Sequence, residues 1–99
     1  MTALECARAY GIAVVFADLG DWGSSCELLS EYDPHAPRIR VNTRILERLN
    51  DAARDEFIAH CIGHELYHHR EALGEIARLP HRRDREAAAD AFARALSRR

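Results

Sequence analysis

The sequence has few of the features that mark specialised classes of protein. No apolar run approaches the roughly 20 residues of a membrane-spanning helix, and the most apolar segment, 11–17, has the length of a strand. Its three cysteines, Cys6, Cys26 and Cys61, have neither zinc-knuckle nor redox spacing, so we interpret them as packing residues. With 14 basic and 16 acidic residues, the net charge of −2 argues against a nucleic-acid-binding surface. These absences predict a cytoplasmic protein with no membrane segment and no direct contact with nucleic acid.

What remains is the composition of one small folded domain. The chain has 99 residues, of which 47% are apolar and 30% are charged, and this balance is typical of a globular protein. Such a length leaves room for one core, so we expect a single domain over residues 1–99. Histidine is the unusual residue, because four of the six histidines crowd into positions 60–69.

The hydrophobic pattern predicts an α+β fold. Turn-forming residues separate the expected elements, which are a helix at 3–10, strands at 12–17, 26–31 and 38–42, a long helix at 52–73 and an alanine-rich helix at 84–97. Asp51 is expected to cap the long helix, and Gly74 is expected to end it. Three strands in succession suggest a small, mainly antiparallel sheet, in which a hairpin joins the first two strands. We expect this sheet to pack on the long helix and on the C-terminal helix.

The expected long helix contains an H-E-x-x-H pattern, His64-Glu65-Leu66-Tyr67-His68. Four residues are just over one helical turn, so both imidazoles project from one face and can reach one Zn²⁺ at about 2.0–2.1 Å. Glu65 lies roughly 100° further around the helix, where it can act on a water molecule without being a ligand. The pattern therefore predicts His64 and His68 as metal ligands and Glu65 as the catalytic residue.

A catalytic zinc needs three protein ligands and one open position, so we expect a third ligand elsewhere. The metzincin pattern is excluded, because Glu71 and Gly74 stand where it needs glycine and histidine. Glu86 and Asp90 lie four residues apart on the last expected helix and therefore share a face. In this E-x-x-x-D arrangement, Glu86 would complete the metal site. Asp90 would accept a hydrogen bond from the far ring nitrogen of a ligand histidine.

Plainer interpretations exist for the same residues. The histidine pair can belong to a solvated helix face, and the two acids can complement a helix dipole. We favour a metal site because two histidines interrupt an apolar stripe and a helix that carries two carboxylates follows at a suitable distance. His60, His69 and His81 have no such support, so we expect them at the surface.

The second half of the chain resembles the ImmA/IrrE-type metallopeptidase domain, a compact gluzincin. The resemblance covers about residues 38–96 and rests on Ile39-Arg40-Val41-Asn42, on Phe57, on the H-E-x-x-H sequence, and on Glu86-Ala87-Ala88-Ala89-Asp90-Ala91-Phe92-Ala93. It implies one Zn²⁺ per chain, held by His64, His68 and Glu86, with Glu65 as general base and acid. Asp90 would not bind the metal itself but would form a hydrogen bond with a ligand histidine. The chain departs from the family at Tyr67, where a small residue is usual, and family members are generally longer.

These residues predict a zinc-dependent metallopeptidase that hydrolyses peptide bonds in a cytoplasmic protein. The resemblance implies a transcriptional repressor of the helix-turn-helix type as the candidate partner. Strand 38–42 is expected beside the cleft, where a sheet edge can pair with an extended substrate. The residue that stabilises the oxyanion stays open between Tyr32, His35, Tyr67, His81 and Arg82. The alternative is a catalytically weak or inactive module that zinc stabilises and that binds a protein partner.

Overall fold

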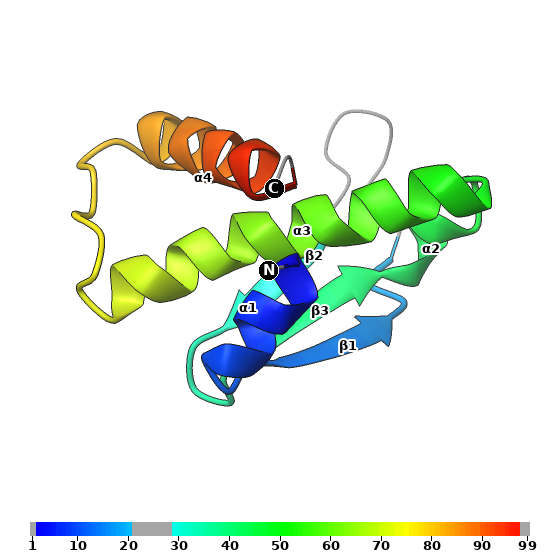
Figure 1. Ribbon diagram of the computed structural model, residues 1–99, viewed down its shortest axis with the longest axis horizontal. Helices are drawn as coiled ribbons and strands as arrows, with labels where there is room; N and C mark the ends of the chain where they lie inside the picture. Colours follow the sequence, from blue (N-terminus) through cyan, green and yellow to red (C-terminus); the bar gives the residue numbers. More distant parts are fainter. Residues whose placement is uncertain (1, 21–28, 98–99) are drawn as a thin grey trace.

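The computed structural model describes residues 2–20 and 29–97, which form an α+β fold (Figure 1). In chain order the elements are α1 (Ala3–Ala9), β1 (Ala13–Ala17), β2 (Ser30–Asp33), β3 (Arg38–Asn42), α2 (Thr43–Leu46), α3 (Asp51–Ala72) and α4 (Arg82–Ser97). The expected fold class is confirmed. None of the helices in the described segments combines the length and the apolar character that crossing a membrane requires.

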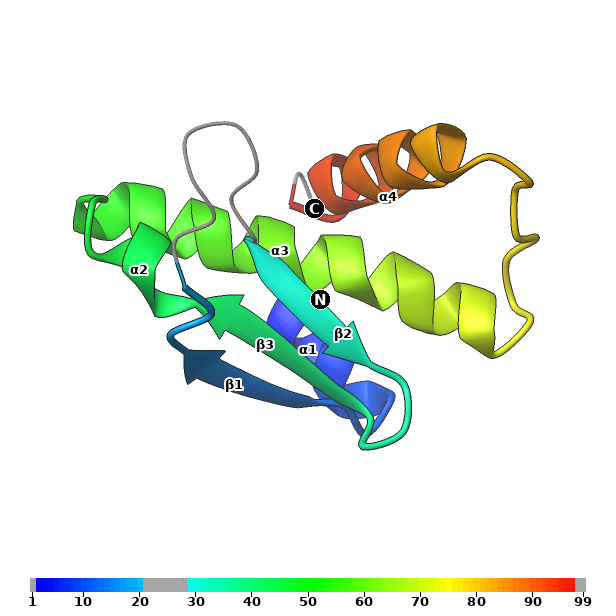
Figure 2. The same ribbon diagram turned by 180° about the vertical axis from the view of Figure 1, so that it is seen from behind.

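The long helix α3 lies between the sheet and α4, as both views show (Figures 1 and 2). After α3 ends, the chain turns back and α4 returns along it, while α1 packs against α3 and β1. Ile39 and Val41 of β3 are fully buried and form one cluster with Cys61, Ile62 and Leu66 of α3. The apolar stripe read from the sequence is therefore the face of α3 that packs on the sheet.

The sheet is mixed, and β3 is its central strand. The strand order is β1-β3-β2, with β1 parallel and β2 antiparallel to β3. The expected hairpin between the first two strands is wrong, because β1 and β2 both pair with β3 instead. The expectation that strand 38–42 lies at an edge is wrong for the same reason. The parallel pair requires a long crossover, which the chain between β1 and β3 provides.

Opposite charges face each other where β2 pairs with β3. Glu31 lies directly opposite Arg40, and Asp33 lies directly opposite Arg38. Both pairs form ion pairs across the strands, the second with 3.6 Å between Arg38 Nη2 and Asp33 Oδ2. The strand therefore runs to Asp33, beyond the expected end at Glu31. The expected strand residues 26–28 lie outside the described part of the chain.

Two asparagines cap the helices that lead to the site. Asn50 Oδ1 accepts a hydrogen bond from the backbone N–H of Ala53 at 2.9 Å, so Asn50 is the cap of α3. The expected cap, Asp51, is instead the first helical residue, where its charge complements the helix dipole. Asn42 is buried and caps α2, and its side-chain amide also donates to the carbonyl of Gly20 at 3.1 Å. Asn42, a residue of the quoted family motif, thus ties β3 to the segment that follows β1.

Helix α4 approaches α3 closely at Gly63. A Cβ added to Gly63 would lie 2.9 Å from the Cα of Ala93, so only glycine fits this crossing. Ala89, Ala93 and Leu96 are the buried residues of α4. Ala95, on the same helix, is exposed.

Tyr67, the bulky residue before the second histidine of the motif, belongs to the same interface. It is 7% exposed, and the centroid of its ring lies 5.9 Å from that of Phe92 on α4. A large side chain is accommodated here because Phe92 packs against it, so the departure from the family pattern leaves the helix pair intact.

Candidate metal centre

The three predicted ligands converge between α3 and α4. Nε2 of His64 lies 2.7 Å from Oε2 of Glu86 and 3.3 Å from Nε2 of His68. Nε2 of His68 in turn lies 3.6 Å from Oε1 of Glu86. Helical periodicity puts both imidazoles on one face of α3, and the packing of α4 at Gly63 brings Glu86 across from them. Two imidazole nitrogens and a carboxylate are donors that suit Zn²⁺.

Each of the two histidines has a carboxylate on its other ring nitrogen. Oδ1 of Asp90 lies 2.8 Å from Nδ1 of His64, in the position predicted for it. Oε1 of Glu71 lies 2.7 Å from Nδ1 of His68. Because a carboxylate only accepts hydrogen bonds, Nδ1 carries the hydrogen in both rings. With Nδ1 engaged in this way, Nε2 is the ring nitrogen of each histidine that points toward Glu86 and would be the one to bind a metal ion.

Glu71 was not predicted from the sequence in this role. Its side chain is 3% exposed and accepts hydrogen bonds from Arg85 of α4 at 3.2 and 3.3 Å. Burial raises the pKa of the Glu71 carboxyl, but the hydrogen bonds from Arg85 and His68 outweigh this effect and hold the pKa below its ordinary value. The spacing of three residues from His68 could have indicated the contact. The contribution of Arg85 depends on how α4 packs.

Asp90 contacts a second histidine as well. Nε2 of His60 lies 3.3 Å from Oδ1 of Asp90, so His60, which was expected at the surface, borders the site. Partial burial raises the pKa of Asp90, but hydrogen bonds from His64 and His60 together bring the pKa below its ordinary value. His60, His64 and Asp90 have ligand atoms within 4.8 Å of one another and form a second group able to hold a metal ion.

Glu65 lies next to the ligands and faces β2. It is 7% exposed, and its Oε2 accepts a hydrogen bond from the hydroxyl of Ser30 at 2.7 Å. One of its oxygens lies within 4.8 Å of ring nitrogens of His64 and His68. Burial raises the pKa of the Glu65 carboxyl above its ordinary value, against the opposing effect of the Ser30 hydrogen bond. The sequence did not reveal Ser30, because its position depends on the strand order of the sheet.

The predicted site opens into a hollow of about 530 Å³ between β2 and the two long helices. Of the five candidate oxyanion donors, Tyr32 and Arg82 line it. His35, Tyr67 and His81 do not line it. Tyr32 is held in place, because its hydroxyl oxygen lies 2.6 Å from Nδ1 of His69.

His69 is buried, so the expectation of a surface position is wrong. The end of α3 packs between α1 and β2, and the ring of His69 meets the rings of Tyr10 and Tyr32 edge to face at 5.5 and 5.6 Å. Burial lowers the pKa of His69, which favours the neutral imidazole. His81 is exposed, as expected.

The described cysteines are buried or half-buried, in keeping with the packing interpretation, although Cys61 also borders the small hollow beside His64 and Glu86. Cys61 is 1% exposed, and burial raises the pKa of its thiol to about 12. Cys6 is half-buried and packs against the same core. Cys26 lies outside the described residues.

Comparison of the chain with protein-family models, with curated proteins and with solved structures finds no match. The geometry of the site and the sequence motifs therefore carry the functional argument.

Proposed function

We propose that this protein is a metallopeptidase in which His64, His68 and Glu86 hold one Zn²⁺. The observation that carries the proposal is the convergence of the two Nε2 atoms on the Glu86 carboxylate, at 2.7 and 3.6 Å, with Glu65 beside them. Two histidines and one glutamate are a ligand set typical of catalytic zinc, which keeps a fourth position open. When bound, zinc would act as a Lewis acid on the scissile carbonyl and on the attacking water.

Glu65 would supply the acid–base chemistry. Ser30 donates its hydroxyl hydrogen to Oε2, which orients the carboxylate and leaves Oε1 to accept a proton from the attacking water. The carboxyl so formed then donates that proton to the nitrogen of the leaving amine. One residue thus serves as base in the first step and as acid in the second.

The edge strand β2 is the element placed to bind an extended peptide. Within the described residues, β2 pairs only with β3, and its residues Ser30 and Tyr32 line the hollow at the site. Backbone groups on the other side of β2 can pair with the main chain of a substrate. This role was expected for strand 38–42, and the strand order transfers it to β2. Recognition through the main chain would suit a protein substrate.

The alternative is a zinc-stabilised binding module without turnover. Structural zinc sites are usually closed by four protein ligands and are rich in cysteine. Here the described donors around the predicted ligands are imidazoles and carboxylates, and Cys61 packs in the core instead. The arrangement therefore favours hydrolysis.

The test compares the zinc-loaded wild-type protein with Glu65→Gln. Glutamine keeps an oxygen for the Ser30 hydrogen bond but cannot take a proton, so we expect unchanged zinc content and a loss of about 10²–10⁴-fold in hydrolysis. The substrates are unfolded proteins and a helix-turn-helix repressor, the class that the family resemblance suggests. Glu47→Gln, an exposed change outside the site, is the matched control.

Mass spectrometry of the fragments gives the readout. A full rate in Glu65→Gln would exclude Glu65 as the base. A wild-type protein that binds zinc and a protein partner but cleaves nothing would favour the binding module.

A further inference from the structure

The hollow at the site continues along α3 in the direction of its N-terminus. A hollow of about 250 Å³ lies next to it and shares Ser30 and His64 with it. This second hollow leads into a third, of about 820 Å³, and Leu29 and His60 line both. We refer to the three connected hollows together as the groove. The predicted zinc ligands lie in its middle, so a chain that reaches the site from one arm leaves through the other.

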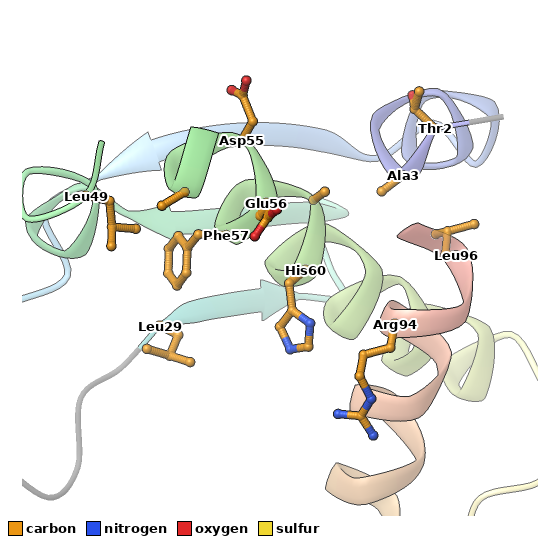
Figure 3. Close-up of a pocket in the computed structure, with 12 residues that line it drawn as sticks. Thr2, Ala3, Leu29, Leu49, Asp55, Glu56, Phe57, His60, Arg94 and Leu96 are labelled. Atoms are coloured by element: carbon orange, nitrogen blue, oxygen red, sulfur yellow. The ribbon is translucent and has the colours of Figure 1, made fainter. Parts of the chain in front are cut away.

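The arm toward the start of α3 is mostly apolar, with Asp55, Glu56 and Arg94 among the residues that line it. Leu29, Leu49 and Phe57 lie around it, with His60 beside them (Figure 3). His60 also lines the small hollow that contains His64 and Glu86. Leu29 is 43% exposed although it stands directly before the edge strand. An apolar side chain of a bound peptide would cover this surface and remove it from water.

The opposite arm carries two exposed arginines at its end, beyond the acidic residues of the site. Arg78 and Arg82 line the hollow there, and both are exposed. Neither forms an ion pair with any residue in the described part of the chain, whereas the neighbouring Arg85 is held by Glu71. These two guanidinium groups are suited to bind a carboxylate of the substrate. Arginine can bind a carboxylate through two parallel hydrogen bonds.

We propose that the substrate is an extended peptide segment with an acidic side chain on one side of the scissile bond and a large apolar side chain on the other. The acid pairs with Arg78 and Arg82, and the apolar side chain packs on Leu29, Leu49 and Phe57. This inference rests on the proposed function, since it takes the zinc ligands as the point of cleavage. Charge complementarity at one arm and continuity of the groove through the site fix the class of occupant.

The test measures peptide binding on zinc-loaded Glu65→Gln protein, so that cleavage does not interfere. The probes are fluorescein-labelled decapeptides with two aspartates on one flank and leucine or phenylalanine on the other, in both chain directions. We expect one direction to bind at least about 10-fold more tightly by fluorescence anisotropy than versions with lysine for aspartate or serine for the apolar residue.

Variants of the two arms separate their contributions. Arg82→Glu should weaken binding of the aspartate peptide and strengthen that of the lysine peptide, and Arg82→Ala should give the first effect alone. Leu29→Gln should weaken binding of the apolar peptides without changing that of the serine version. Arg83→Glu and Leu73→Gln change exposed residues that do not line the groove and should leave all affinities as they are.

Equal affinity for all peptides, or aspartate peptides unaffected by Arg82→Glu, would overturn the inference. Cleavage by the wild-type protein is recorded separately on the same peptides. Cleavage without preference refutes the peptide class and leaves the metallopeptidase standing. The expected binding preference without any cleavage supports the groove and refutes the metallopeptidase.

Discussion

Helix α3 has two packed faces, and they are built differently. Toward the sheet it presents Cys61, Ile62 and Leu66, each 1% exposed, which belong to the apolar core cluster. Toward α4 it presents His64 and His68, whose ring nitrogens all face a carboxylate or each other. Polar side chains can line a packed face when each polar atom has a partner. One face of the helix therefore belongs to the core under the sheet, and the other combines packing against α4 with the candidate metal site.

A larger residue at Gly63 should have the largest effect, because it disturbs the face of α3 toward α4 and leaves the face toward the sheet unchanged. In Gly63→Leu the added side chain meets the backbone of Ala93, so α4 must move away and take Glu86 and Asp90 with it. We expect a loss of about 3 kcal/mol in the free energy of unfolding and loss of zinc binding. Thermal unfolding and titration calorimetry measure the two effects. Ala52→Leu, at an exposed position of α3, is the control. Unchanged zinc affinity in Gly63→Leu would contradict the role of this crossing.

Removing either carboxylate behind the histidines should have a smaller effect. Asp90→Ala and Glu71→Ala should each weaken zinc binding by about 10–100-fold. Each removes the carboxylate that holds the imidazole of a ligand histidine in its orientation. Only Glu71→Ala should also destabilise the metal-free protein, by about 1–3 kcal/mol, since it leaves Arg85 without its partner at the α3–α4 interface.

Calorimetry with zinc and thermal unfolding in chelator give the two readouts. Asp84→Ala, an exposed change in the first turn of α4, is the matched control. If the two variants lose stability equally, the clamp between Glu71 and Arg85 does not distinguish them.

The last prediction concerns the face of α3 that packs on the sheet, where we expect Cys61 not to react with an alkylating reagent. The pKa of the Cys61 thiol is raised to about 12, so at pH 8 it stays protonated and buried. Iodoacetamide should therefore leave Cys61 unmodified in the native protein and alkylate it after unfolding. Peptide mapping by mass spectrometry measures both, with the half-buried Cys6 as internal comparison. Rapid native alkylation of Cys61 would mean that this face opens.

The sequence predicted the part of the site that lies on one helix. His64, Glu65 and His68 depend only on helical periodicity, and the pattern placed them correctly on α3. Glu86 and Asp90 shared a face of the next helix, so they needed only that α4 should return along α3. The structure brings these groups together at 2.7–3.6 Å.

The contacts between elements could not be read from spacing. Ser30 reaches Glu65 because β2 is the edge strand beside the site, and this strand order is a property of the tertiary fold. Arg85 reaches Glu71 because Gly63 lets α4 approach closely. The apolar pattern of the chain carries no information on which strand is central, and this is why the hairpin and the edge strand were predicted wrongly.

X-ray absorption at the zinc edge of the loaded protein tests the metal centre most directly. The predicted spectrum has only nitrogen and oxygen neighbours, at about 2.0–2.1 Å, with the outer-shell signal of two imidazoles. In Glu86→Ala an oxygen neighbour should be replaced or lost and zinc affinity should fall by about 10-fold or more. A sulfur shell near 2.3 Å, which would indicate cysteine ligands, or a Glu86→Ala protein with the wild-type spectrum and affinity, would contradict the proposed ligand set.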